Sequence, residues 1–297
     1  MSWLFYAFLA ALTYGTYYIL LKRNINREFI WSYFAFFFTL LFALLIPFTS
    51  FVNFPQEKVV WGIILLHVAL LAMFFFFSSI AYKHLEESEV SPLGNLGLIV
   101  MVLVGMFIFR ETLTLLQLLG VALMIVGAFI LEAGIHISRF KRVFKSAVHR
   151  KYIYCIFLAI LFSVSSSILE KIILDPSVLN LSFAPLEPFS LNYITRGLLM
   201  CFFLSRAFFK KEFIPRLRHI YHHAGWLMLL AAVVYNVANI SYFTALSLGN
   251  FTEVIPIASL STLFIVLVGG SLFHEHHLKQ KVVASIIMII ATWLIVM

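Results

Sequence analysis

The chain has 297 residues, of which 63% are hydrophobic and only 11% are charged, and its formal net charge is +8. A soluble domain carries about 25% charged residues, because these keep its surface in water. The composition therefore excludes a soluble globular fold and indicates a protein that lies in a lipid bilayer. Within lipid, apolar runs of about 20 residues are predicted to be helices, because each helix satisfies its own backbone hydrogen bonds.

Ten apolar segments follow one another along the chain, and they predict an all-α integral membrane protein with ten transmembrane helices. The expected spans are 3–21, 30–50, 60–82, 90–109, 114–133, 152–174, 189–208, 225–246, 254–273 and 281–297. The basic stretch 134–151 divides these spans into two sets of five. We expect a first five-helix repeat at 1–133, a cytoplasmic linker at 134–151 and a second repeat at 152–297. Binding of lipid headgroups by the linker is the less favoured alternative.

One motif occurs twice, 164 residues apart, in the fourth and ninth spans. The identical pairs are Glu89/Glu253, Val90/Val254, Pro92/Pro256, Val102/Val266, Leu103/Leu267, Val104/Val268, Gly105/Gly269, Phe109/Phe273 and Glu111/Glu275. Apolar composition alone would not place Glu, Pro and Gly in the same register, so the motif indicates an internal duplication. Because five is an odd number, the second repeat must begin on the opposite side of the membrane. Two inverted repeats are the usual build of a membrane transporter that works by alternating access.

The basic residues predict the orientation in the membrane. Of the 21 Lys and Arg residues, 17 lie in the loops that follow the first, third, fifth, seventh and ninth spans. Loops rich in Lys and Arg remain on the cytoplasmic side. Both termini are therefore predicted to lie outside.

Polar residues within the apolar spans are candidate functional groups, because a charge at the centre of a membrane helix costs about 2.5–3.5 kcal/mol. In the first half, Tyr17 and Asn95 are candidate substrate contacts. Pro92 and Pro256 each leave a backbone carbonyl without its helical partner, and we expect both to form helix breaks near the axis that relates the repeats. Close packing at that axis is the alternative explanation.

Glu170 and Lys171 lie late in the sixth span, where adjacent side chains point about 100° apart and are not expected to pair strongly. Either both extend to the membrane interface, or one or both face a water-filled cavity. Arg196 lies in the middle of the seventh span, and its permanent charge requires an anion, carbonyl groups or water. A contact with a substrate anion and a salt bridge with Glu170 or Glu187 are the two alternatives.

The eighth span carries a polar stripe, which we expect on one helix face: Tyr235, Asn236, Asn239 and Tyr242. The stripe can join helices or form a wall for a substrate, and its two tyrosines favour the wall. Glu111 and Glu275 lie at the short turns that follow the fourth and ninth spans, and they are expected to cap or brace those turns. The residues 274–277 contain three histidines without counterparts in the first repeat, so we expect neither a metal nor a cofactor.

The repeated signature Pro92…Glu111 and Pro256…Glu275 in a chain of ten spans resembles the drug/metabolite transporter superfamily, EamA type, over essentially the whole chain. Members commonly carry these Pro and Glu residues, and Arg196 resembles a basic residue often found in the seventh span. The chain departs from the family pattern in its tenth span, where the fifth-span glycines are replaced by alanines. It also has no acid in the first span, which argues against proton-coupled export of cationic drugs.

The sequence, with this resemblance, predicts a secondary active transporter rather than an enzyme, acting as an exporter or exchanger. Its partners would be a small anionic or zwitterionic metabolite and the lipid bilayer, and not a nucleic acid; a homodimer is left open. The substrate would cross by alternating access through a cavity between the halves. The alternatives are a non-transporting scaffold or receptor and a lipid-handling membrane protein on the same fold.

Overall fold

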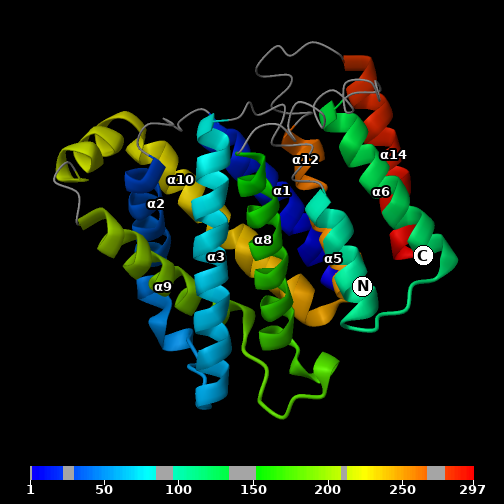
Figure 1. The fold of residues 1–297 in the computed structure, drawn as a ribbon, viewed down its shortest axis with the longest axis horizontal. Helices are drawn as coiled ribbons and strands as arrows, with labels where there is room; N and C mark the ends of the chain where they lie inside the picture. The colour runs from blue at the N-terminus through cyan, green and yellow to red at the C-terminus, as the bar shows by residue number, and fades with distance from the viewer. Residues whose placement is uncertain (1, 23–29, 85–95, 134–151, 209–212, 266–277) are drawn as a thin grey trace.

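The computed structural model describes residues 2–22, 30–84, 96–133, 152–208, 213–265 and 278–297, and the regular structure in these ranges is helical (Figure 1). The first half contains α1 (Ser2–Lys22), α2 (Ile30–Leu45), α3 (Lys58–His84), α5 (Leu96–Phe107) and α6 (Leu115–Ala133). The second half contains α8 (Ile153–Leu174), α9 (Pro188–Phe208), α10 (Phe213–Leu248), α11 (Phe251–Ala258), α12 (Ser261–Phe264) and α14 (Leu278–Val296). Since α11 and α12 together occupy the ninth expected span, the prediction of ten helical spans is confirmed.

Five of the described helices have the length and composition of membrane spans. Within the described residues, α1, α2 with its 3-10 extension, α3, α8 and most of α10 are long and apolar enough to cross a bilayer, and four further apolar helices are shorter. Large apolar side chains cover their outer faces, as Leu65, Leu66, Ile286 and Ile289 show with exposed fractions of 47% or more. Lipid is the solvent that suits such a surface. The chain is a multi-pass integral membrane protein.

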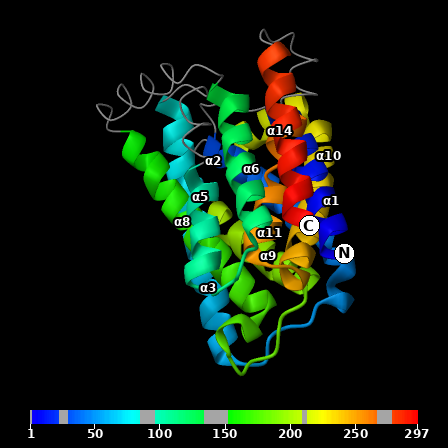
Figure 2. The ribbon, with the colours of Figure 1, turned by 90° about the vertical axis from the view of Figure 1, so that its right-hand side faces the viewer.

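The contacts between helices follow the two repeats. The first helix of each repeat packs on the third helix of the other, so that α1 lies on α10 and α8 lies on α3. The second, fourth and fifth helices pack on their own counterparts: α2 on α9, α5 on α11, and α6 on α14. Figures 1 and 2 show α6 and α14 side by side and running in opposite directions. This pattern is the one that two inverted repeats around a pseudo-twofold axis produce, and it confirms the predicted fold class.

Small residues bring α6 and α14 into close contact. A Cβ atom on Gly120 would lie 2.8 Å from the carbonyl oxygen of Ala291, and one on Gly127 would lie 3.4 Å from that of Ala284. Ala284 and Ala291 are the residues that correspond to Gly120 and Gly127 in the second repeat. The replacement of glycine by alanine in the tenth span therefore keeps the close approach of the two backbones that small residues allow.

One helix differs from its expected length. The expected spans 189–208 and 225–246 leave 209–224 as a connector, but α10 begins at Phe213 and continues to Leu248. Pro215 does not prevent this, because it lies in the first turn, where the backbone N–H has no partner within the helix. The basic residues between 213 and 224 therefore belong to a helix and not to a loop.

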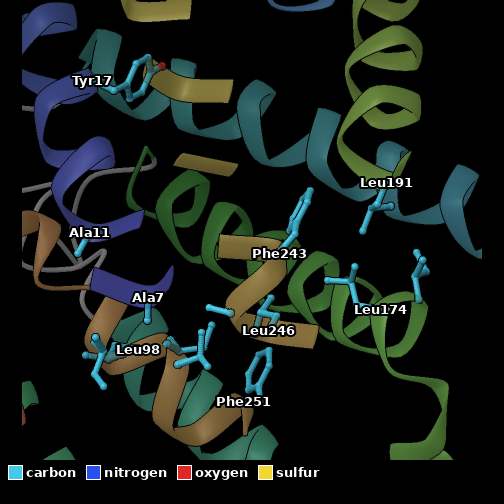
Figure 3. Close-up of a cluster of buried hydrophobic side chains, with 14 of the residues drawn as sticks. Ala7, Ala11, Tyr17, Leu98, Leu174, Leu191, Phe243, Leu246 and Phe251 are labelled. Atoms are coloured by element: carbon cyan, nitrogen blue, oxygen red, sulfur yellow. The ribbon is translucent and has the colours of Figure 1, made fainter. Parts of the chain in front are cut away.

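A packed apolar core joins the two repeats around the ends of α10 and α11. Figure 3 shows Ala7 of α1 and Leu98 of α5 close to Leu246 of α10 and Phe251 of α11, while Tyr17 lies apart from this group, further along α1. All five side chains are buried. A polar group reaches the edge of this cluster, because Lys171 donates to the carbonyl oxygen of Leu246.

Candidate functional site

Arg196 is the centre of a buried polar network between α1, α2, α9 and α10. Its side chain is only 2% exposed. The guanidinium donates from Nε to Oδ1 of Asn192 (3.1 Å) and from Nη2 to Oδ1 of Asn239, while Nη1 has no hydrogen-bond partner. No carboxylate of the described residues lies within 4.0 Å of it. The predicted salt bridge with Glu170 or Glu187 is therefore absent from this part of the chain, and the charge rests on neutral amides.

Each amide around Arg196 both donates and accepts a hydrogen bond. Asn192 donates to Oδ1 of Asn236 (3.1 Å), and Asn236 donates to the carbonyl oxygen of Leu41 on α2 (3.1 Å). Asn239 donates to the carbonyl oxygen of Tyr235 (2.8 Å) and also accepts from the hydroxyl of Tyr14 on α1 (3.1 Å). Because these bonds hold both amide oxygens against the guanidinium, they preorganise Arg196 and leave Nη1 as its free donor.

Aromatic rings form one side of this network. Tyr235 lies with its ring 5.1 Å from Cζ of Arg196, a cation–π distance. The ring of Tyr17 is 4.4 Å from that of Tyr235 and 5.6 Å from that of Phe37. Tyr14 packs edge-on against Tyr235 and Tyr242. On α10, Tyr235 and Asn239 contact both α1 and α9, whereas Asn236 contacts α2 and α9.

A second buried polar group lies between α3 and α8. His67 has no exposed surface, and Glu170 is 7% exposed. Nδ1 of His67 lies 2.9 Å from Oγ of Ser166 and 3.9 Å from Oε1 of Glu170. Nε2 of His67 is buried and has no hydrogen-bond partner. Glu170 is therefore enclosed by the protein, and it faces the imidazole.

Lys171 points to a different part of the molecule. Its ammonium donates to Oδ2 of Asp175 (3.0 Å) and to the carbonyl oxygens of Leu246 (2.9 Å) and Gly249 (3.0 Å). Burial opposes the charged form of Asp175, but hydrogen bonds from Ser177 and Lys171 hold the pKa of its carboxyl below its ordinary value. All three ammonium protons are thus used, two of them in joining α8 to the end of α10, and the structure does not bring Lys171 together with Arg196.

Glu111, a predicted turn residue, lies at the start of the helix that contains Pro256. Glu111 accepts hydrogen bonds from the backbone N–H groups of Phe251 (2.6 Å) and Thr252 (2.8 Å), the first residues of α11. Arg110 before it has a φ of 55°, the left-handed conformation that ends many helices. Pro256 lies inside α11, which ends two residues later, and α12 begins at Ser261. A carboxylate from the first repeat thus caps the broken helix of the second.

Three candidates, Pro92, Asn95 and Glu275, lie outside the described residues. Among the described residues, sequence reasoning missed His67 and Asn192, which the structure places in the two polar groups. His67 could have been found as a single histidine in the middle of a long apolar span. Asn192 could have been found four residues before Arg196, on the same helix face.

Comparison with known proteins gives a family and a fold. The model of the EamA-like transporter family matches residues 1–132 and 150–297. A solved structure titled "Crystal structure of protein" is similar over 99% of this chain and 96% of that one, with a TM-score of 0.70 and 13% sequence identity. At that identity the likeness shows the fold alone. A comparison with curated proteins found no match.

Proposed function

Because the chain belongs to the EamA-like transporter family, we propose that it is a secondary active transporter of a small organic anion or zwitterion. It acts as an exporter or exchanger and moves its substrate by alternating access between the two inverted repeats. Pro92 and Pro256 act as helix breaks beside the transport path.

The observation that carries this proposal is the buried charge of Arg196. A guanidinium stays protonated at physiological pH, and the hydrogen-bond partners of this one are neutral amides, with no carboxylate of the described residues in direct contact. Nη1 has no partner, so it is available to a carboxylate or phosphate oxygen. Arginine suits such a contact because its fixed donors match the geometry of these anions.

The remaining candidates surround this contact. Tyr17 and Tyr235 supply apolar ring faces, and Asn236 and Asn239 hold the guanidinium in place. Tyr14 lies within electrostatic range of both Arg196 and Glu170, which connects the two polar groups. Lys171 and Asn95 stay predictions as substrate contacts.

Thermal unfolding of the purified protein across a panel of organic acids, amino acids and sugar phosphates tests the proposal. A ligand that binds only the folded protein raises the unfolding temperature by mass action. We expect a stabilising anion whose effect is lost in Arg196→Gln. The matched control is Arg206→Gln, because Arg206 lies on the same helix but is exposed at its end, over Trp31.

The two variants separate the outcomes. Stabilisation that vanishes in Arg196→Gln and persists in Arg206→Gln supports a specific anion contact and identifies the substrate class. Stabilisation that survives Arg196→Gln in full contradicts the anion site, whatever else the ligand contacts. Transport is then measured in proteoliposomes loaded with the ligand found in the panel.

A further inference from the structure

His67 and Glu170 form a second ionisable group that the proposed anion contact does not use. Both side chains are buried, and they come from different repeats, because α3 belongs to the first and α8 to the second. The 3.9 Å between Nδ1 and Oε1 exceeds a hydrogen-bond length, and Ser166 lies 2.9 Å from the same nitrogen. Each ring nitrogen can hold a proton in one tautomer, so this arrangement can accept or release one without moving a helix.

The unpaired Nε2 of His67 is the second observation that indicates a ligand. In the tautomer with hydrogen on Nε2, that hydrogen has no acceptor; in the other tautomer, the lone pair of Nε2 has no donor. A buried polar atom without a partner costs about 1–3 kcal/mol, so its persistence requires a compensating role. Binding of a proton or of a substrate oxygen would supply the partner.

Among the described residues, few charged or titratable groups surround the pair. α9, which carries Arg196, packs on α3, which carries His67, and the charge of Arg196 acts on both His67 and Glu170. Tyr14 of α1 and Tyr242 of α10 lie in range of Glu170. α5, which also packs on α8, carries only apolar residues and glycine. Lys171, the next residue in the chain, has its ammonium on Asp175 and two carbonyl oxygens.

The geometry points to a proton-binding site at His67 and Glu170 that is linked to the anion site at Arg196, so that the protein carries an anion and a proton together. This inference rests on the proposed function for its anion. With the site empty, the positive charge of Arg196 stabilises the carboxylate of Glu170. When a substrate anion binds Arg196, two anions would face one cation, and Glu170 takes up a proton from water through His67. Release of the anion reverses the step, and the proton leaves on the same side.

Infrared spectroscopy of the ligand-free protein in lipid tests the proton site. The carbonyl-stretch band of a protonated carboxylic acid is followed while the pH is changed between about 5 and 8, the range in which histidine-based switches operate. We expect a band that titrates in the unaltered protein and is lost in Glu170→Gln, which keeps the size of the side chain. The matched control is Glu187→Gln, because Glu187 is exposed and its removal should leave the band unchanged.

The link to Arg196 is tested by the same band. Removing a guanidinium near a carboxylate disfavours the ionised form by about 1–3 pH units. Arg196→Gln should therefore move the transition to higher pH, whereas Arg206→Gln should not. If Glu170→Gln misfolds, Glu170→Asp serves instead, and it should keep a band with a changed transition.

The outcomes are distinct from those of the anion test. A band that persists in Glu170→Gln, or the absence of any titrating band, overturns the proton site even if the anion contact at Arg196 is correct. An equal change in Arg196→Gln and Arg206→Gln overturns the link between the sites. Ligand stabilisation that survives Arg196→Gln in full, together with a titrating band that Glu170→Gln removes, would contradict the proposed function and leave the proton site standing.

Discussion

Lys171 and Arg196 are buried cations with opposite surroundings. Lys171 has one carboxylate and two carbonyl oxygens around three protons, so its charge is balanced and its donors are used. Arg196 has two amide oxygens and one nitrogen without a partner. Burial alone therefore does not distinguish a structural cation from a binding cation, whereas the number of unused donors does.

Lys171→Met should lower the stability of the folded protein. The change leaves two carbonyl oxygens and Asp175 without their donor, a loss of about 1–3 kcal/mol for an unsatisfied buried group. Thermal unfolding in detergent measures it, with Lys58→Met as control because Lys58 is exposed at the start of α3. If Lys171→Met keeps its stability but loses ligand stabilisation, Lys171 contacts substrate, as the sequence predicted.

The sequence located the buried charges but not their partners. Glu170, Lys171 and Arg196 are conspicuous because each is a charge within an apolar run. Arg196 donates to Asn192 and Asn239, and Tyr14 donates to Asn239. These three residues come from three helices, and the rotation that each helix adopts depends on how the helices pack. His67 was missed although it is a single histidine in a long apolar span, and that it lies beside Glu170 depends on the packing of α3 against α8.

At the scale of the element, contacts across the repeats depend on glycine and on a helix cap. α6 and α14 approach each other through Gly120 and Ala291. α5 approaches α11 at Gly105, where an added Cβ would lie 3.4 Å from the backbone nitrogen of Thr252. The sequence showed these small residues at matched positions of the repeats. It did not show which backbone atoms they meet, because that depends on the crossing of two helices far apart in the chain.

Gly120→Ala should destabilise the protein. The new methyl group would lie 2.8 Å from the carbonyl oxygen of Ala291 and 2.9 Å from the backbone nitrogen of Ile295, so a backbone must move. Overpacking of this kind costs about 1–3 kcal/mol. The control is Gly62→Ala in α3, where nothing lies within 4 Å and alanine should leave stability unchanged or raise it. Equal unfolding temperatures for the two variants would show that α6 and α14 pack less closely than described.

Glu111→Gln should weaken the start of α11. The carboxylate accepts from two backbone N–H groups at the positive end of that helix, and loss of its charge and of one acceptor should cost about 1–2 kcal/mol. Thermal unfolding measures this loss, and Glu57→Gln, at an exposed residue, is the comparison. A transport defect without loss of stability would instead assign Glu111 to the transport cycle.

At the scale of the whole molecule, the inverted repeats explain why the polar groups lie where they do. The pairings α1 with α10 and α3 with α8 are equivalent under the exchange of repeats. Each pairing holds one buried polar group: Tyr14 and Asn239 in the first, His67 and Glu170 in the second. A motion that exchanges the conformations of the repeats changes both interfaces together, which is how an anion contact and a proton site can be coupled.

The orientation of this assembly in the membrane is a prediction from charge. Ten crossings place both termini on one side, and Figures 1 and 2 show the two ends of the chain close together. With 17 of 21 basic residues in the loops on the other side, that side should be cytoplasmic and the termini outside. A reporter that is active only outside the cytoplasm should be active when fused after Met297 and inactive when inserted in the linker 134–151. The reverse pattern would place the basic loops outside, and the positive-inside rule would then fail for this chain, since ten crossings keep the two fusion sites on opposite sides in either orientation.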